Sequence, residues 1–300
     1  MKILLTGASG FIGSNLLLAL LEKNYSVIGT GSRTEVDVPI ELLNLDLESI
    51  DYKKLKIDVC FHLAANNDTL DKDLNSMLKS NLINPSNMFL NLQKNGCKKF
   101  IYASSTAVYG NQKAPFCEKT VPCPLNPYAY SKLAFEKWAT EFSIKTQTTV
   151  IGLRYSNVYG PREFHKGKRS SMILQLFNQM KEGKSPRIFK NGNQKRDWCY
   201  VKDVVNANLK CLIFEGREIL NIASGVSVEF NSIVDILNKN INTNLIPEYF
   251  SCPFIDKLQT NTQCNINKSK EMLGWEPYYS IEEGIKDYVN YLSLPIKYQN

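Results

Sequence analysis

The stretch from Asn126 to Lys132 places two side chains that can carry acid–base chemistry one helical turn apart. Pro127 suits the first position of a helix, because its φ is already fixed and its missing N–H is not needed there. Lys132 follows Tyr128 by four residues, so the ammonium and the phenol share a helix face that Tyr130 does not. A nearby cation favours an ionised phenol and lowers its pKa. The spacing therefore predicts a tyrosine that acts as a general base at ordinary pH, without histidine, metal or thiol.

A helix that carries Tyr and Lys is common by chance, so the chemistry depends on the surrounding elements. Near the N-terminus a short apolar strand, Lys2–Thr6, leads directly into Gly7, Gly10 and Gly13. An amphipathic helix and a second strand follow, an order typical of dinucleotide-binding units. The glycines permit a tight turn and close approach of the backbone to a pyrophosphate, which the helix N-terminus attracts. The residues expected to hold the dinucleotide here are Gly7, Ser9, Gly10, Phe11, Ile12 and Gly13.

The tip of the second strand bears on the choice of dinucleotide. A site for NAD would place Asp or Glu there to bond the ribose 2′-hydroxyl. The sequence instead has Gly31, Ser32 and Arg33, and Arg33 with Ser32 could hold a 2′-phosphate. We therefore expect NADP, with NAD as the open alternative, because Arg33 could also be a solvated loop arginine.

Later segments supply the other residues expected at the cofactor. A short segment ends beside the adenine, and a buried strand over 57–63 runs into small residues that let a cofactor lie close. The residues expected there are Asp46, Leu47, Leu63, Ala64 and Ala65. Asn81, in a helical segment over about 73–95, is also assigned to the cofactor site and could bridge backbone groups across the sheet. His62 has no obvious carboxylate partner in the sequence and is interpreted as structural.

Three hydroxyl side chains, those of Ser104, Ser105 and Thr106, follow the strand at 99–103. The carboxyl ends of parallel strands face the ligand crevice in folds of this kind. One of these hydroxyls could bond both the Tyr128 phenol and a hydroxyl of the substrate. Serines at a strand end are also ordinary turn formers, so this assignment depends on the fold.

Composition limits the classes of protein and partner. No apolar run approaches the roughly 20 residues that span a bilayer, and no signal peptide is evident. Eight scattered cysteines without CxxC spacing, and two histidines, indicate neither a zinc site nor a disulfide framework, so we expect no metal and reduced thiols in a cytoplasmic protein. The net charge of +7 is spread along the chain without a nucleic-acid motif. This favours small anionic ligands over nucleic acid.

The alternation of strands and helices predicts an α/β fold, a Rossmann doubly wound parallel sheet with a smaller mixed α/β substrate-binding domain at the C-terminus. After a strand over 149–154 the composition becomes polar and glycine-bearing. We place the cofactor domain at residues 1–166, with about 196–222 returning to it. The substrate domain is expected over 167–300.

In order and spacing these motifs resemble the extended short-chain dehydrogenase/reductase superfamily, the nucleotide-sugar epimerases and dehydratases. The elements that carry the resemblance are Thr6–Gly13, Tyr102–Gly110, Tyr128 with Lys132, and Leu153–Arg162. A narrower similarity is to the ADP-glycero-manno-heptose 6-epimerases, and it rests on residues 160–167, 183–186, 195–197 and 256–258. The His-Lys-Gly sequence at 165–167 is the most discriminating, since relatives that act at C4 of hexoses generally lack it.

The resemblance implies transient oxidation of a sugar hydroxyl. Tyr128, as phenolate, would take the proton while hydride leaves for the nicotinamide, and Ser105 or Thr106 would hold the oxygen. Lys132 would bind the nicotinamide ribose and keep Tyr128 ionised. The ketone would turn its other face, and the returning hydride would invert the stereocentre. In a heptose-type site Lys166 would assist proton transfer opposite Tyr128.

The resemblance also implies how the nucleotide sugar is held. Asn157 and Arg196 are the candidates for the diphosphate, the arginine by bidentate bonding. The substrate-binding residues expected on this basis are Ser105, Thr106, Asn157, His165, Lys166, Phe189 and Arg196. Two departures from the heptose enzymes are Thr262, where those relatives have Tyr, and the tip at 31–33, which lacks their Asp-Asn.

Other activities are weighed against this one. A 4,6-dehydratase would need Asp-Glu where this chain has Thr106 and Ala107. A UDP-hexose 4-epimerase or a nucleotide-sugar reductase stays open, because Tyr128, Lys132 and Ser105 would serve each. An NADP-binding regulatory or RNA-binding protein on the same fold is the alternative outside enzymes, although it would be marked by loss of Tyr128 or Lys132. From the resemblance we expect a nucleotide-diphosphate sugar as substrate and a homo-oligomer, a dimer or larger, with no nucleic-acid or membrane partner.

Overall fold

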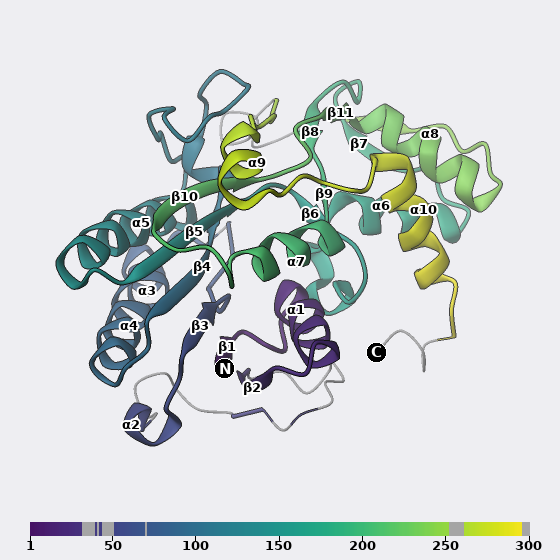
Figure 1. Ribbon diagram of the computed structural model, residues 1–300. Helices are drawn as coiled ribbons and strands as arrows, with labels where there is room; N and C mark the ends of the chain where they lie inside the picture. The colour runs from purple at the N-terminus through teal and green to yellow at the C-terminus, as the bar shows by residue number, and fades with distance from the viewer. Residues whose placement is uncertain (32–39, 41, 44–50, 70, 252–260, 296–300) are drawn as a thin grey trace.

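The computed structural model describes residues 1–31, 40, 42–43, 51–69, 71–251 and 261–295. At its centre lies a six-stranded sheet in which each strand runs parallel to its neighbours (Figure 1). Its strands are β1 (Lys2–Thr6), β2 (Ser26–Thr30), β3 (Val59–His62), β4 (Lys99–Ser105), β5 (Thr149–Tyr155) and β10 (Arg217–Ile222). Their order is β10-β5-β4-β3-β1-β2, and an isolated parallel bridge joins Thr30 to Leu43 beyond β2. The predicted parallel α/β sheet is confirmed.

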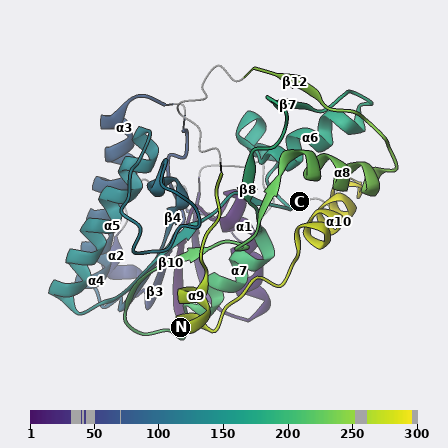
Figure 2. The ribbon, with the colours of Figure 1, turned by 90° about the horizontal axis from the view of Figure 1, so that it is seen from above.

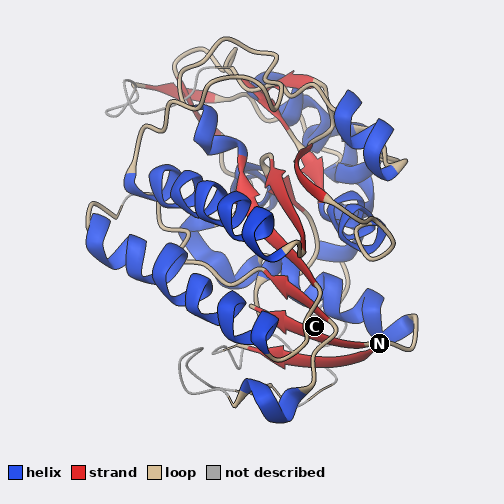
Figure 3. Ribbon diagram, turned by 60° about the vertical axis from the view of Figure 1, so that its left-hand side comes forward, coloured by secondary structure: helices blue, strands red, loops and turns tan. Residues whose placement is uncertain are grey.

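Helices cover both faces of this sheet. They are α1 (Phe11–Glu22), α2 (Tyr52–Leu55), α3 (Leu74–Leu78), the π-helical turn η1 (Lys79–Ile83), α4 (Asn84–Lys94), the 3-10 turn η2 (Thr106–Tyr109), α5 (Pro127–Thr146), α7 (Val201–Lys210) and α9 (Asn267–Leu273). On one face α1 packs beside α7, and on the other α4 and α5 lie side by side (Figures 1 and 3). All seven residues of β5 are buried, as expected of a strand covered on both faces.

A second lobe has its own apolar core. Its elements are β6 (Val158–Tyr159), the 3-10 segment η3 (Phe164–Arg169), α6 (Met172–Lys181), β7 (Arg187–Phe189), β8 (Lys195–Asp197), β9 (Cys199–Tyr200), β11 (Ser227–Glu229), α8 (Phe230–Ile241), β12 (Glu248–Phe250) and α10 (Ile281–Leu292). The β8–β11 ladder is antiparallel, whereas β7–β12 and β6–β9 are parallel. Figure 2 shows this lobe beside the sheet lobe, to which the chain returns through α7 and β10. Within the described part of the chain, no helix has both the length and the apolar character of a membrane span.

The start of α5 follows from the local sequence. The Asn126 side chain accepts a hydrogen bond of 2.9 Å from the N–H of Ala129, and Pro127 occupies the first turn, which satisfies a donor that the helix cannot use itself. Ala129, Lys132 and Glu136 are buried along one face of the helix, and this face meets β4 and β5. The predicted helix start is therefore confirmed, and it fixes where the Tyr128 and Lys132 side chains leave the backbone.

Candidate active site

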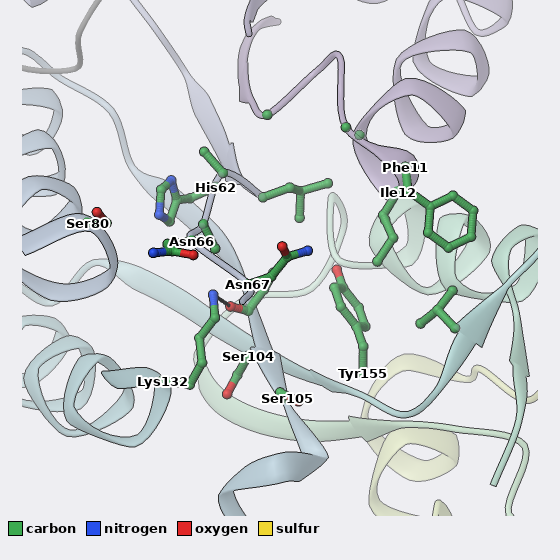
Figure 4. Close-up of a pocket in the computed structure, with 18 of the residues that line it drawn as sticks. Phe11, Ile12, His62, Asn66, Asn67, Ser80, Ser104, Ser105, Lys132 and Tyr155 are labelled. Atoms are coloured by element: carbon green, nitrogen blue, oxygen red, sulfur yellow. Dashed lines mark hydrogen bonds between the residues drawn. The ribbon is translucent and has the colours of Figure 1, made fainter. Parts of the chain in front are cut away.

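A cleft of about 710 Å³ lies at the carboxyl ends of β1, β3 and β4. The predicted site residues that line it are Gly7, Ser9, Gly10, Phe11, Ile12, Gly13, Leu63, Ala64, Ala65, Ser105, Tyr128, Lys132, Asn157, His165 and Lys166. Figure 4 shows Lys132, Ser104 and Ser105 on one side of the cleft and Phe11 and Ile12 on the other. Residues 120 positions apart in sequence are thus brought to one place, as parallel topology requires.

Some predicted residues lie elsewhere. Thr106 donates its hydroxyl to the Tyr155 carbonyl at 3.3 Å. In the second lobe Phe189 packs against Phe250 with ring centroids 4.5 Å apart, and the Arg196 guanidinium lies 5.7 Å from the Phe230 ring centroid. None of these three is among the residues that line the cleft. The residues Ser32, Arg33, Asp46 and Leu47, and the sequence at 256–258, fall outside the described residues.

Asn81 is also absent from the cleft lining, although the sequence assigned it to the cofactor. It is buried, and its amide bonds both backbone polar groups of Asn66, which does line the cleft. The expected bridging of backbone groups is present, but it connects the loop after β3 to α5 through Ser131. In this geometry Asn81 supports the cleft through Asn66 and does not line it directly.

The glycine turn is closed so tightly that side chains would not fit. A Cβ atom at Gly13 would lie 2.0 Å from the Gly7 carbonyl oxygen, and one at Gly10 would lie 3.0 Å from it. Gly7 has φ +72°, and a Cβ there would lie 2.8 Å from the Ala64 nitrogen. The bare backbone leaves the N-terminus of α1 open toward the cleft, and such a terminus suits the phosphates of a dinucleotide. These residues therefore fit a pyrophosphate.

His62 lies against the cleft in a neutral form. Its Nδ1 is 2.8 Å from the Thr6 hydroxyl oxygen, which also accepts the N–H of Ala64 at 3.3 Å. Burial, together with the nearby Lys132 ammonium, lowers the pKa of His62 to about 3. The ring packs against Phe89 and Phe135. A neutral, packed imidazole agrees with a structural role, but the residue also lines the cleft.

Tyr128 and Lys132 face the cleft from the first turns of α5. The Lys132 ammonium donates to the Ala103 carbonyl at 2.9 Å and lies 5.9 Å from the Tyr128 ring centroid. Burial lowers the pKa of Lys132 to about 8, and the Glu136 charge opposes this shift. Burial raises the pKa of Tyr128, against a smaller opposite effect of the Ser105 hydroxyl. The expectation that Lys132 lowers the pKa of Tyr128 is therefore wrong for this arrangement, because desolvation of the phenol dominates.

A buried polar network supports the end of β4 and was not anticipated. The Glu136 carboxylate accepts hydrogen bonds from the Ser104 hydroxyl at 2.5 Å and from Arg154 at 2.8 and 2.6 Å. Arg154 also donates to the Tyr109 hydroxyl at 2.8 Å. The one signal in the sequence is that Glu136 follows Lys132 by four residues, which places both on one helix face.

Other residues that line the cleft were also missed. They are Thr30, Asn66, Asn67, Ser80, Asn84, Ala103, Tyr155 and Val158. Two further residues of the lining, Ser104 and Gly31, are placed by the sequence at the crevice and at the strand tip, without a definite assignment to the site. Asn66 and Asn67 directly follow the predicted Ala64 and Ala65, so their position after a parallel strand was the available signal. No comparable signal marks Ser80, which comes from η1.

The segment at 164–169 brings Lys166 from the second lobe to the glycine turn. The Lys166 ammonium lies 5.2 Å from the Phe11 ring centroid, within range of a cation–π contact. Glu163 anchors this segment, because its buried carboxylate accepts the Ser171 N–H and hydroxyl, each at 2.7 Å. Lys166 therefore faces the same cleft as Tyr128, from the other lobe.

Asn157 is fixed by two other segments of the chain. Its Nδ2 donates to the Asp197 carbonyl at 3.1 Å and to the Thr262 hydroxyl at 3.2 Å. The Thr262 hydroxyl also accepts the N–H of Asp197. Thr262, the position of a departure from the heptose enzymes, thus serves to hold Asn157 at the cleft. Among the residues that the structure describes, no cluster of His, Cys, Asp or Glu could hold a metal ion.

Comparison with known proteins gives a consistent result. A family profile described as the NAD dependent epimerase/dehydratase family matches residues 3–223. The chain is 33% identical over 308 residues to "Putative UDP-glucose 4-epimerase" of Methanocaldococcus jannaschii, covering 97% of this chain and 98% of the relative.

Two solved structures are similar over nearly their full length. The ADP-L-glycero-D-manno-heptose-6-epimerase of Helicobacter pylori has a TM-score of 0.86 at 31% identity, with 98% of this chain and 96% of that one covered. The UDP-glucose 4-epimerase of Thermotoga maritima, solved with UDP-glucose, has a TM-score of 0.88 at 30% identity, with 97% and 98% covered.

Proposed function

Since the chain belongs to the NAD dependent epimerase/dehydratase family, it is an enzyme of that family, and we propose that it epimerises a nucleotide-diphosphate sugar. The observation that carries the proposal is the meeting of the glycine turn, Ser105, Tyr128 and Lys132 at one cleft. When bound, the nicotinamide dinucleotide supplies a ring that takes a hydride from a sugar carbon and returns it. The residues proposed to hold it are Gly7, Ser9, Gly10, Phe11, Ile12, Gly13, Leu63, Ala64, Ala65 and Lys132.

Proton transfer and the binding of the reacting oxygen are assigned to side chains of the protein. Tyr128 is proposed to take the proton of a sugar hydroxyl. Ser105, whose hydroxyl opposes the rise that burial causes in the pKa of the phenol, is proposed to hold that oxygen. Lys132 stays beside Tyr128 as a cation, bonded to the Ala103 carbonyl. Lys166 is proposed to move a proton on the opposite face of the sugar, because it reaches the cleft from the second lobe.

The sugar is proposed to be an ADP-heptose inverted at C6. The His-Lys-Gly sequence at 165–167 supports this choice, as does the similarity to the Helicobacter pylori enzyme. A UDP-hexose inverted at C4 is the second candidate, and it is favoured by the similarity to the Thermotoga maritima enzyme. Asn157, His165, Phe189 and Arg196 are proposed to hold the nucleotide or the sugar. For Phe189 and Arg196 this is proposed from the family resemblance alone, because neither lines the cleft.

The test combines a substrate panel with one substitution. The protein is incubated with ADP-heptose and with a set of UDP-hexoses, and the sugars are analysed by NMR. Tyr128→Phe should reduce turnover by about 10²–10⁴-fold, the range of general acid–base catalysis, without loss of dinucleotide binding. Tyr130→Phe, an exposed tyrosine on the same helix, is the matched control and should retain full turnover. Inversion of no nucleotide sugar, or full turnover by Tyr128→Phe, would refute the proposal.

The family description names NAD, and the choice of NADP remains a proposal. It is supported by the sequence alone, in which no carboxylate stands at the strand tip, residues 31–33, and Arg33 could hold a 2′-phosphate. Titration of each dinucleotide by fluorescence should show the tighter dissociation constant for NADP. Arg33→Ala should weaken NADP and leave NAD unchanged. Tighter binding of NAD to the unmodified protein would refute this assignment.

Three further expectations stay proposals. A homo-oligomer is supported by exposed apolar side chains along η1, α4 and α5, those of Ile83, Leu90, Tyr130 and Ile144. Light scattering should give at least twice the mass of one chain, reduced by Ile144→Glu. A cytoplasmic location is supported by the free thiols of the seven described cysteines. The division into residues 1–166 with about 196–222 for the cofactor and 167–300 for the substrate also stays a proposal, although its bounds differ from those of the two lobes at β6, η3, β8, β9 and α9.

A further inference from the structure

The Glu136 carboxylate lies directly beneath the active cleft without facing it. It is 2% exposed and sits one helical turn beyond Lys132 on the buried face of α5. One of its oxygens accepts the Ser104 hydroxyl and Arg154 Nε, and the other accepts Arg154 Nη2. Ser104 lines the cleft next to Ser105, and the neighbouring Ala103 carbonyl is the hydrogen-bond acceptor of Lys132. One buried anion is therefore connected to the end of β4 and to α5, which form the same side of the cleft.

We propose that Glu136 is a positioning residue that keeps the Lys132 ammonium charged and holds the end of β4 against α5. This role rests on the proposed function only in that it concerns the same site. The group acts through Lys132 and Ser104 and does not touch the ligand cleft itself.

The charged and titratable groups around Lys132 come from its own helix and from two further elements, β3 and β5. On α5 they are Tyr128 and Glu136, and from β3 His62 faces the ammonium. From β5 the Arg154 guanidinium approaches, but both of its charge-assisted bonds are made to Glu136. From β4 the site presents the Ala103 carbonyl.

Of these neighbours, Glu136 is the group that favours the charged lysine. Burial lowers the pKa of Lys132 to about 8, and the Glu136 carboxylate acts in the opposite direction. His62 is neutral and supplies no negative charge to the ammonium. Without the carboxylate the ammonium would lose its proton at a lower pH, because a buried charge is costly when nothing compensates it.

If the Glu136–Arg154 ion pair had a purely structural role, its removal would change the stability of the protein without moving the titration of Lys132. Removing one partner of a buried pair is destabilising through the charge left behind, so Glu136→Gln alone can fail to fold. The double variant Glu136→Gln/Arg154→Gln removes both charges and avoids that penalty. Tyr109→Phe is the matched control, since it removes a hydrogen bond of the same network, that from Arg154 Nη1, without changing any charge.

The experiment follows the titration of Lys132 by NMR in protein carrying ¹³C at the lysine Cε, with Lys132→Arg to assign the signal. In Glu136→Gln the midpoint should fall by about one pH unit or more, a tenfold loss of proton affinity. In the double variant it should also fall, but by less, because the Arg154 cation is removed with the carboxylate. It should stay unchanged in Tyr109→Phe. The alkaline limb of the turnover profile should move with it. An unchanged midpoint in the Glu136 variants, or an equal shift in Tyr109→Phe, would overturn the proposal.

This titration needs neither substrate nor turnover. A shifted midpoint in an unmodified protein that inverts no sugar would support the role of Glu136 and refute only the proposed function. Turnover of the unmodified protein on a nucleotide sugar, together with an unchanged Lys132 midpoint in the Glu136 variants, would support the proposed function and refute the role of Glu136.

Discussion

The Asn81 side chain bonds both polar groups of the Asn66 backbone. Its Oδ1 accepts the Asn66 N–H at 2.8 Å, and its Nδ2 donates to the Asn66 carbonyl at 2.8 Å. The same Nδ2 donates to the Ser131 hydroxyl at 3.0 Å, which connects this loop to α5. Because Asn66 lines the cleft, a buried amide that does not line it determines part of its shape.

Asn81→Asp should weaken dinucleotide binding by about tenfold. The carboxylate has nearly the same shape but cannot donate, so the partly buried Asn66 carbonyl loses its partner, a change that costs about 1–3 kcal/mol. Titration of nicotinamide fluorescence measures the dissociation constant. Asn91→Asp is the control, because its amide bonds the Asn87 carbonyl on the exposed side of α4. Equal dissociation constants for the two variants would contradict the role assigned to Asn81.

Gly13→Ala should destroy the glycine turn. The new Cβ would lie 2.0 Å from the Gly7 carbonyl oxygen and 2.8 Å from its carbon, both backbone atoms that cannot move aside cheaply. We expect a loss of stability at or above the upper end of the about 1–3 kcal/mol typical of an overpacked site, with loss of dinucleotide binding. Gly10→Ala, with its Cβ at 3.0 Å, should lose less. Urea unfolding measures both, and equal losses would contradict the geometry.

Features set by neighbouring residues could be predicted from the sequence. The N-cap at Asn126 and the following proline fix the start of α5, and the spacing of Tyr128 and Lys132 then fixes their common face. The glycine turn between β1 and α1 was equally local. Because strands of a parallel sheet end at one edge, Ser105 could also be placed at the cleft before the fold was known.

Features set by burial could not be predicted. The direction of the Tyr128 pKa depends on how much protein surrounds the phenol, which the spacing to Lys132 does not reveal. The bonds of Glu136 to Arg154 and Ser104 join residues 18 and 32 positions apart. The cation–π contact of Lys166 with Phe11 joins two lobes. Each depends on packing that only the folded chain defines.

Deprotonation of Asp197 should make the protein less stable as the pH rises from about 4 to 6. Its buried carboxylate accepts hydrogen bonds from Ser224, Gly225 and Cys264, and burial raises its pKa from 3.8 to about 6. The folded state therefore binds the proton more tightly than the unfolded state, so stability is lost as this proton leaves.

The difference between the two pKa values of Asp197 corresponds to about 3 kcal/mol. Asp197→Asn cannot titrate, so the stability of the unmodified protein relative to this variant should fall by up to that amount between pH 4 and pH 7. Urea unfolding across this range gives the two curves. Curves that run parallel would show that Asp197 does not titrate as stated.

The titration of Lys132 should have the opposite effect at alkaline pH, where the stability of the protein should rise with pH. Its pKa is lowered from 10.5 to about 8 in the folded state, so between these values the unfolded chain holds a proton that the folded chain has released. Stability therefore rises with pH across this window, and below pH 8 the folded state carries the full cost of a buried ammonium, about 3 kcal/mol.

Lys132→Met should therefore stabilise the fold and abolish turnover. The apolar side chain has a similar length, so at pH 7 the variant should gain up to about 3 kcal/mol, less about 1 kcal/mol for the lost hydrogen bond to Ala103. Turnover should be lost. The gain should shrink as the pH rises from 8 toward 10, because the native lysine becomes neutral in the unmodified protein. Urea unfolding at a series of pH values measures this, with the exposed Lys137→Met on the same helix as control. A stability difference that does not change with pH would show that Lys132 is not titrating inside the fold.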